Sequence, residues 1–389
     1  MKGATRRGHP GGAEQPPCPH RPPCPGCPRY GDPGISTAAR SALEALAHLH
    51  GLPEVPVVSG ATSGFRLRAR LAIRGRQGAP KIGMFQLGSH RVVPIPDCSV
   101  QHPLVNRIAA VVRQALVDAE VTPYSEVPHT GVARYLQVVV ERGSQSAQVV
   151  LVANSATVEP LAACLDLVRE RLGAELHSLW FNSHCERSNT ILGPGFVNWC
   201  GPASVIERFG GAAVHYPPGA FGQNNLDIAD RIVEHVRAQV PESARVAEFY
   251  AGVGAIGLSL LPRAREVRMN EVSPHSLHGM ALGIAALDAA DRARVEVLPG
   301  AAGEVIESAS GADVVIADPP RKGLDRGLLE HLSRQPPRLF LYVSCGLESL
   351  VEDTASLTSG GKLSLRGLTA FNLMPFTEHV ESVARFERV

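Results

Sequence analysis

The sequence predicts an α/β protein, with a parallel α/β domain over residues 217–389 and an α+β region before it. In the C-terminal part, helix-sized segments alternate regularly with short apolar runs of strand length, which is the pattern of a parallel sheet. Between residues 101 and 216, helical and strand patterns are mixed without that regularity. The first 35 residues are rich in Pro, Gly, Cys and Arg, a composition that cannot bury a core. We therefore expect three parts: residues 1–100, 101–216 and 217–389.

The expected elements follow from hydrophobic periodicity, taken in chain order. Helices are expected at residues 37–50, 104–119, 159–172, 225–240, 273–287 and 350–357, with another directly after Gly254. Strands are expected at residues 66–73, 82–86, 135–140, 148–152, 246–250, 266–270, 295–298, 314–317, 339–343 and 380–386. Residues 75–79 read as a turn between the first two strands, which together form a hairpin.

The charges are balanced overall but not locally. The chain of 389 residues has 38 Lys and Arg against 37 Asp and Glu, so the whole molecule does not attract nucleic acid electrostatically. Residues 65–91, here called the basic hairpin, contain no acidic residue, and strand alternation places Arg66, Arg68 and Arg70 on one face. Scattered charges are often only a solvated surface, but seven of one sign favour contact with phosphates. The basic residues are Arg66, Arg68, Arg70, Arg74, Arg76, Lys81 and Arg91.

No apolar run is long enough for a membrane span or a secretory signal, so we expect a cytoplasmic protein without a membrane partner. The cytoplasm keeps thiols reduced, so the eight cysteines are expected to serve metal binding, catalysis or packing rather than disulfides.

A glycine-rich turn follows the expected strand at 246–250. Gly252, Gly254 and Gly257 fit the G-x-G-x-x-G spacing between a strand and a helix, where the backbone can approach a ligand. Glu271 ends the next strand, where a carboxylate can bind ribose hydroxyls. This pattern leaves a nicotinamide dinucleotide, adenosylmethionine or a simple tight turn open.

Two later strands also end in chemically capable residues. The strand at 314–317 leads into Asp318-Pro319-Pro320-Arg321, in which the prolines stiffen the loop, Asp318 can bind a base edge and Arg321 a phosphate. The strand at 339–343 leads into Ser344-Cys345, and a thiol there is either a nucleophile or a small packing residue. Near the C-terminus, His379 and Glu381 share a strand face and either could accept a proton at the sheet edge.

In this order and spacing, the motifs resemble the RNA uridine-5-methyltransferase family, whose members modify tRNA or 23S ribosomal RNA. The resemblance covers residues 218–389 strongly and residues 18–106 clearly. The stretches that carry it are Phe221-Gly222-Gln223-Asn224-Asn225, Tyr250-Ala251-Gly252-Val253-Gly254, Asp318-Pro319-Pro320-Arg321-Lys322-Gly323, Ser344-Cys345 and His379-Val380-Glu381.

The resemblance implies a Rossmann-like class I methyltransferase domain behind an α+β RNA-recognition region, with S-adenosylmethionine as cofactor. It implies that Cys345 adds to carbon 6 of uracil and that Glu381 removes the carbon 5 proton after methyl transfer. By the family pattern, Gln223, Tyr250, Gly252, Gly254, Glu271 and Asp318 form the cofactor and base site.

Several positions depart from the family pattern without removing the nucleophile or the base. Glu248 stands where the family usually has Asp, Ala251 where it has Cys, and Asn372 where it has Asp. Gly346-Leu347 replace an Asn-Pro, and Pro299-Gly300-Ala301-Ala302 lacks the usual acidic residue, which leaves the adenine contacts open.

Cys18, Cys24 and Cys27 form C-x5-C-x2-C, and Cys98 follows far downstream. Four thiolates suit an iron–sulfur cluster or a structural zinc ion equally well, and His20 could replace one of them. The family resemblance favours a [4Fe-4S] cluster, hence an N-terminal iron–sulfur knot next to the basic hairpin. Cys164, Cys185 and Cys200 lack such spacing and are expected to be packing residues.

Only 17 residues precede Cys18, so no N-terminal β-barrel of the kind many relatives use for RNA is expected. With the cluster, this favours 23S ribosomal RNA over tRNA as the substrate of a monomeric enzyme. Two other classes of protein would explain part of the sequence. An NAD-dependent oxidoreductase has no use for Asp318-Pro319-Pro320-Arg321, and a non-catalytic metal-knot RNA-binding protein leaves Cys345 and Glu381 without a role.

Overall fold

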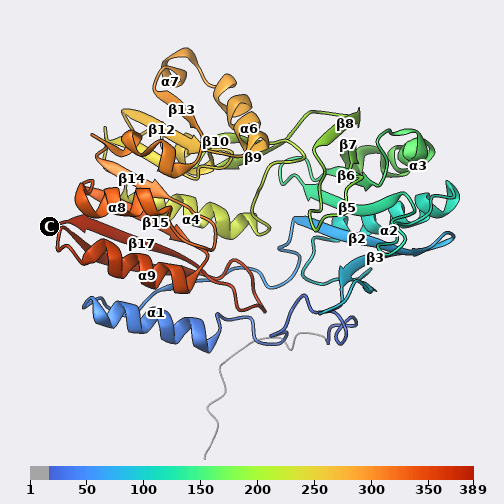
Figure 1. The fold of residues 1–389 in the computed structure, drawn as a ribbon, viewed down its shortest axis with the longest axis horizontal. Helices are drawn as coiled ribbons and strands as arrows, with labels where there is room; N and C mark the ends of the chain where they lie inside the picture. The colour runs from blue at the N-terminus through green and yellow to red at the C-terminus, as the bar shows by residue number, and fades with distance from the viewer. Residues whose placement is uncertain (1–16) are drawn as a thin grey trace, which may run out of the picture.

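The computed structural model describes residues 17–389 and contains two large sheets joined by a linking segment (Figure 1). The first is an eight-stranded, mainly parallel sheet in the order β1-β16-β17-β15-β14-β11-β12-β13 within the described chain. Its strands are β1 (Val57–Val58), β11 (Arg245–Phe249), β12 (Glu266–Glu271), β13 (Val295–Pro299), β14 (Val314–Ala317), β15 (Leu339–Ser344), β16 (Leu363–Phe371) and β17 (Glu381–Arg388).

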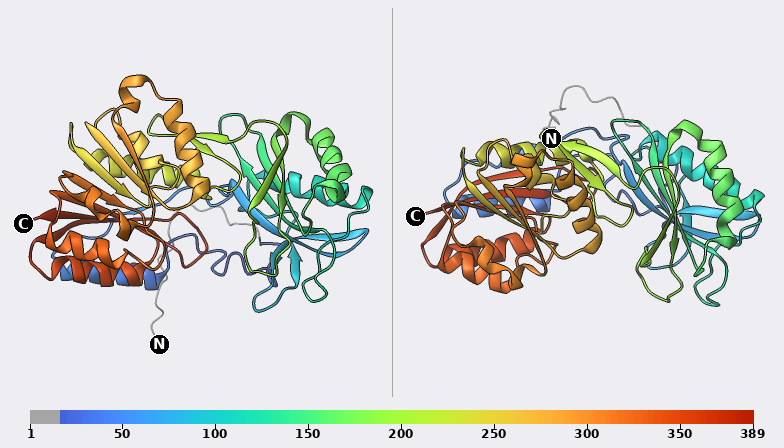
Figure 2. Two further views of the ribbon diagram at one scale, coloured as in Figure 1. Left: turned by 45° about the horizontal axis from the view of Figure 1, so that its top comes forward. Right: turned by 90° about the horizontal axis from the view of Figure 1, so that it is seen from above.

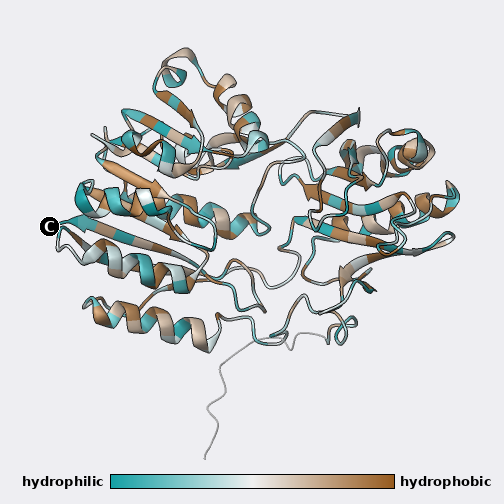
Figure 3. Ribbon diagram, in the orientation of Figure 1, coloured by the Kyte–Doolittle hydropathy of each residue, from teal (hydrophilic) through white to brown (hydrophobic). Residues whose placement is uncertain are grey.

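Helices cover both faces of this sheet, because its strands carry apolar side chains on both faces. Val314 and Ile316 belong to the hydrophobic cluster that includes α4, α5 and α6, whereas Val315 and Ala317 pack with α1, α8 and α9. Figure 3 shows β14 as a continuous hydrophobic strand, as a strand buried on both faces requires. The helices are α1 (Thr37–Leu49), α4 (Leu226–Gln239), α5 (Ala255–Ser259), α6 (Pro274–Ala285), α7 (Ala289–Arg292), α8 (Arg326–Arg334) and α9 (Leu347–Thr358), with 3₁₀ turns η3 (Ala302–Glu304) and η4 (Ile306–Ala309).

The second sheet has seven strands in the order β4-β3-β2-β5-β6-β7-β8 and is called the central sheet. Helices α2 and α3 cover its face away from the first sheet (Figure 2, right), and none of the helices formed by residues 17–389 covers the other face. Its elements are β2 (Arg68–Arg76), β3 (Ala79–Phe85), β4 (Val92–Pro94), α2 (Pro103–Asp118), β5 (Ala133–Val140), β6 (Ala147–Ala153), η1 (Glu159–Leu161), α3 (Ala162–Leu172), η2 (Gly173–Glu175), β7 (Leu176–Ser183) and β8 (Gly195–Cys200). The hairpin β9 (Val205–Phe209) and β10 (Ala212–Tyr216) follows and leads into the first sheet.

The parallel α/β architecture of the C-terminal part is confirmed, and each helix and strand expected there is found within a few residues of its expected bounds. The basic hairpin forms as well, as β2 and β3 around a turn at Gln77 and Gly78. It pairs with β5, so the expected boundary at residue 100 falls inside one sheet.

Two expectations about single residues were wrong. Arg66 does not share a strand face with Arg68 and Arg70, because β2 begins only at Arg68 and Arg66 turns into the cysteine pocket. Cys185 is exposed in a loop rather than packed. In the described part of the chain, every helix is too short or too polar to span a bilayer.

Candidate active site

The chemically capable residues gather at one edge of the eight-stranded sheet. Strands β11, β12, β14 and β15 are mutually parallel, so their carboxyl ends meet at the same edge, where α/β sheets bind ligands. The glycine turn, Glu271, Asp318 and Cys345 each lie at or directly after the end of one of these strands. Four motifs that are far apart in the sequence therefore form one site.

The thiol and the expected base lie at the ends of two neighbouring antiparallel strands. Ser344 at the end of β15 is paired with Ser382 of β17, so Cys345 and Glu381 are the next residues outward on each strand. The pKa of Cys345 is raised to about 11, first by burial and then by the Glu381 and Asp318 carboxyls, while Arg321 lowers it. The pKa of Glu381 is raised to about 8, first by burial and then by Asp318. The four side chains therefore lie close enough to act on one another electrostatically.

Arg321 is the cation of this group and is exposed at its rim. Its Nη2 atom lies 3.2 and 3.0 Å from the two ring nitrogens of His379. His379 lies before β17 begins and is exposed, so it contacts Arg321 rather than sharing a strand face with Glu381. Asp318 is half-buried, and burial raises its pKa to about 7.

The glycine turn is built around two left-handed backbone positions. Gly252 and Gly254 have φ of 59° and 84°, which L side chains adopt at a cost, and the space beside Gly252 is open. Tyr250 also has a positive φ of 60°, and its hydroxyl accepts a hydrogen bond of 2.8 Å from the backbone N–H of Asp325. The Tyr250 side chain thus joins the glycine turn to the loop that carries Asp318.

Glu271 closes this turn from the next strand. One carboxylate oxygen accepts a hydrogen bond of 2.8 Å from the Gly252 N–H, and the other accepts from Val272 and Ser273 at 2.8 and 2.7 Å. Three charge-assisted bonds fix the carboxylate at the turn, where a ribose would lie if the turn binds a nucleoside.

Beneath the turn lies Glu248, which is only 2% exposed. One of its oxygens, Oε2, has no hydrogen-bond partner, and its pKa is raised to about 8 by burial and by Asp318 and Glu271. Glu248, Asp318 and Glu381 are thus three carboxyl groups that act on one another electrostatically, and Arg321 acts on Glu381 and Cys345. A cation bound beside them would favour their ionised forms.

Gln223 lies in the segment that links the two sheets and lines a small pocket beside Arg68 and Tyr216. The carbonyl of Asn224 accepts a hydrogen bond from Leu67 of the central sheet, and the Asn225 amide donates to Leu373 near β17. Phe221, two residues earlier, is 66% exposed. Sequence reasoning gave Phe221 no role, although an exposed aromatic ring beside a catalytic segment suits contact with a base.

The four N-terminal cysteines lie together. Cys18, Cys24, Cys27 and Cys98 line one pocket with His20 and Arg66, and burial followed by the charge of Cys98 raises the pKa of Cys27 to about 11. Across residues 17–389, however, no group of three or more His, Cys, Asp or Glu side chains is arranged to hold a metal ion. His20 Nε2 accepts a hydrogen bond from the Asp97 N–H, which argues against His20 as a ligand in this arrangement.

Comparisons with known proteins identify relatives that are RNA methyltransferases. Residues 304–389, which contain Asp318, Cys345 and Glu381, match the family model described as tRNA (Uracil-5-)-methyltransferase. An uncharacterized RNA methyltransferase of Protochlamydia amoebophila is 35% identical over 335 residues, covering 85% of this chain and 87% of the relative. Another from Gloeobacter violaceus is 30% identical, covering 91% of this chain and 78% of the relative.

Among solved structures, the tRNA (uracil-54, C5)-methyltransferase of Pyrococcus abyssi, in complex with S-adenosyl-L-homocysteine, superposes with a TM-score of 0.72 at 24% identity. It covers 89% of this chain and 81% of that chain, and at this identity the likeness speaks for the fold. Fold and site together define an S-adenosylmethionine-dependent methyltransferase. The chain belongs to the RNA uridine-5-methyltransferase family and is an RNA uracil methyltransferase.

Proposed function

We propose that this enzyme forms 5-methyluridine in 23S ribosomal RNA, with Cys345 as covalent nucleophile and Glu381 as general base. The observation that carries the mechanism is the placement of a thiol and a carboxyl at the ends of the paired strands β15 and β17, beside Asp318 and Arg321. A nucleophile and a base that act on adjacent carbons of one ring must be neighbours in this way.

The chemistry needs a thiol because carbon 5 of uracil is too weak a nucleophile to take a methyl group directly. The Cys345 thiolate forms a bond to carbon 6, which places electron density on carbon 5. When bound, S-adenosylmethionine would supply an electrophilic methyl group to carbon 5, and its sulfonium would leave as the thioether of S-adenosylhomocysteine. Glu381 then takes the carbon 5 proton, and the bond between carbon 6 and sulfur breaks to release the thiolate.

The local electrostatics assign separate tasks to the charged groups. Arg321 lowers the pKa of Cys345 and so favours the reactive thiolate, against the effect of burial and of the two carboxyls. Asp318 is well placed for a hydrogen bond to the uracil edge, and its raised pKa allows it to donate as well as accept. Glu381 must be ionised to act as a base, so its raised pKa makes activity depend on pH.

Cofactor binding is proposed for the turn and its surroundings. The open space beside Gly252 admits the ligand, Glu271 is in reach of ribose hydroxyls, and a sulfonium bound nearby would favour the ionised form of the buried Glu248 carboxyl. Tyr250 acts indirectly in this scheme, because its hydroxyl is bonded to the Asp325 backbone. Gln223 and Gly254 complete the set, on the family pattern.

The test of the mechanism uses RNA that contains 5-fluorouridine, which has no proton at carbon 5 for Glu381 to remove. With S-adenosylmethionine, the wild-type protein should form a covalent adduct that persists on a denaturing gel. Cys345→Ala should abolish it, whereas Cys185→Ala, which alters an exposed cysteine, should leave it unchanged. An adduct that survives in Cys345→Ala contradicts the covalent mechanism.

Cys18, Cys24, Cys27 and Cys98 are the ligands proposed for a [4Fe-4S] cluster. The proposal rests on their spacing, their shared pocket and the nearby cation Arg66, while the side chains as placed do not form a metal-binding group. Protein purified without oxygen should be brown and contain about four irons and four sulfides per chain. Stoichiometric zinc in a colourless preparation would overturn it.

Two kinds of RNA are candidate substrates, 23S ribosomal RNA and tRNA. The cysteine pattern favours 23S ribosomal RNA, whereas the solved relative from Pyrococcus abyssi acts on uracil 54 of tRNA. Mass-spectrometric mapping of 5-methyluridine in both RNAs from a strain lacking the gene decides between them. Loss of the modification from tRNA alone would refute the ribosomal assignment.

A further inference from the structure

The helix-free face of the central sheet contains a hollow of about 420 Å³, here called the aromatic hollow. Its floor is open because Ala72 of β2 is paired with Gly83 of β3, and neither carries a large side chain. Phe85 and Tyr135 form the walls, with ring centroids 6.4 Å apart at nearly a right angle. Arg70, His90 and Asn189 add polar groups at the rim. A flat polar ring fits this combination of aromatic walls and polar edges.

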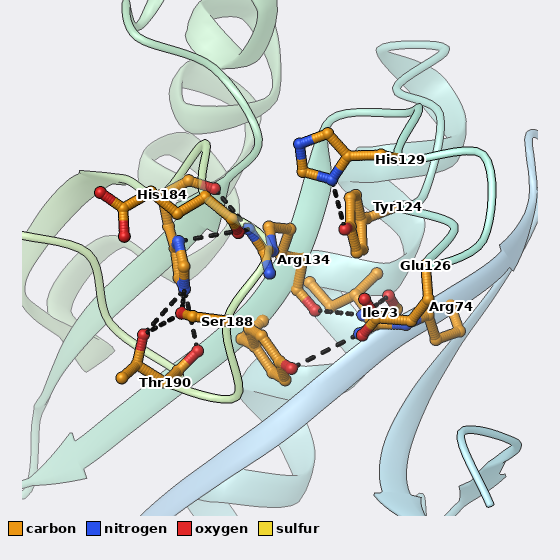
Figure 4. Close-up of polar contacts among 11 residues, drawn as sticks. Ile73, Arg74, Tyr124, Glu126, His129, Arg134, His184, Ser188 and Thr190 are labelled. Carbon is orange, nitrogen blue, oxygen red and sulfur yellow. Dashed lines mark hydrogen bonds and ion pairs between the residues drawn. The ribbon is translucent and has the colours of Figure 1, made fainter.

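A buried polar network fixes the walls. Arg74, which is 8% exposed, lies 5.1 Å from the Tyr135 ring and 5.2 Å from the Phe85 ring, and its Nη2 forms an ion pair of 2.6 Å with Glu126 (Figure 4). The neighbouring Arg134 is fully buried, and its Cζ atom lies 4.3 Å from the centroid of the Tyr124 ring.

Burial of two guanidinium groups costs free energy that apolar residues in the same places would not. In return, the aromatic walls are held in one position, which lowers the entropy cost of binding a ring against them.

A second, cationic hollow of about 330 Å³ adjoins the first and shares His90 and Glu126 with it. Lys81 and Arg91 line it and are exposed, and Lys81 is paired across the hairpin with Arg74. One carboxylate, Glu126, faces these cations. An aromatic hollow beside a cationic one matches a nucleotide, which has a flat base and a negatively charged phosphate.

Hydrogen bonds connect the aromatic hollow to residues 218–225, which are part of the segment that links the two sheets and include Gln223. Arg70 Nε donates to Gln137 Oε1 at 2.8 Å, and the Gln137 amide donates to the Pro218 carbonyl at 2.7 Å. On the same strand face, Arg68 donates to the Ala220 carbonyl at 2.7 Å. Pro218 and Ala220 lead directly to Gln223, so a base in the hollow lies against residues that orient the segment next to the active site.

We propose that the aromatic hollow binds an unpaired nucleotide of the RNA substrate other than the target uridine, with its phosphate in the cationic hollow. This second base site would select RNA by a splayed-out nucleotide at a fixed distance from the target. It rests on the proposed function only in that the ligand is RNA, and it makes no use of Cys345.

The test uses a fluorescent oligoadenylate of about 12 nucleotides, which offers bases for stacking but no uracil for the active site. Phe85→Ala should weaken binding about tenfold, as expected for the loss of one stacked base. Lys81→Gln, an exposed change that keeps the fold, should weaken binding and reduce its salt dependence by about one phosphate contact. Arg113→Gln, on helix α2 behind the sheet, is the matched control and should bind like wild type.

Ultraviolet cross-linking of the same oligoadenylate should place the adduct on the peptide containing Phe85 or Tyr135. Equal affinity in Phe85→Ala, Lys81→Gln and wild type, or a failure to bind oligoadenylate at all, overturns the second base site. The 5-fluorouridine adduct reports on Cys345 alone. If no adduct forms but oligoadenylate binds normally, the covalent mechanism is refuted and the proposed second base site is not.

Discussion

Replacing Glu248 by glutamine should change how the stability of the protein depends on pH. Burial and the neighbouring carboxyls raise the pKa of Glu248 from 4.5 to about 8, so the folded protein keeps this proton at pH 7. The unfolded chain releases it above pH 4.5. The stabilisation that comes with the proton is therefore fully present below pH 4.5 and is lost as pH rises through about 8.

The magnitude follows from the two pKa values. Within this window, each pH unit lowers the free energy of unfolding of the wild type by about 1.4 kcal/mol. Between pH 5 and pH 7 the wild type should therefore lose about 3 kcal/mol of its free energy of unfolding relative to Glu248→Gln. Urea unfolding of both proteins at pH 5, 6 and 7, followed by circular dichroism, measures this difference. Glu352→Gln, which removes an exposed carboxylate on α9, should track the wild type. A constant difference between Glu248→Gln and wild type at all three pH values would refute the reasoning.

The remaining predictions concern catalysis and the turn. Glu381→Gln should retain methyl transfer but accumulate a covalent enzyme–RNA species with ordinary uridine, lowering turnover by about 10²-fold or more, which a denaturing gel and a product assay would detect. For wild type, kcat/KM should rise continuously from pH 6 to pH 9, because Glu381 and Cys345 have pKa values of about 8 and 11 and both act in their ionised forms; a fall within this range would contradict these roles. Tyr250→Phe should lower the free energy of unfolding by about 1 kcal/mol through loss of the bond to Asp325, measured by urea unfolding, and an unchanged stability would show that water replaces the hydroxyl.

Much of the fold could be predicted from the sequence because the C-terminal elements are local and regular. Buried strands such as β14 and β15 are continuous apolar runs, and their ends identify Asp318 and Cys345 directly. Strand β16 was missed because Gly367 interrupts its alternation, and the structure shows a shift in strand register at that place. The two-residue strand β1 could not be foreseen, since it exists only through pairing with the distant Ala370 and Phe371.

The site was predictable as a set of residues but not as an arrangement. Motif spacing identified Cys345 and Glu381, yet only the antiparallel pairing of β15 and β17 explains why they are neighbours. The bonds of Glu271 to the glycine turn and of Tyr250 to Asp325 depend on backbone positions that no sequence pattern encodes. The aromatic hollow could not be predicted from the sequence, because its residues come from strands and loops that meet only in the folded sheet.

The insertion of β17 between β15 and β16 has a consequence for how the enzyme is made. The chain leaves the ribosome from its N-terminus, so the proposed nucleophile Cys345 emerges well before the proposed base Glu381 and the rest of β17. Until residues 381–388 emerge, β15 and β16 lack the strand between them, and β1 has no finished sheet to join. On the proposed mechanism, a nascent chain is thus unable to methylate RNA until residues 381–388 have emerged from the ribosome and paired with β15.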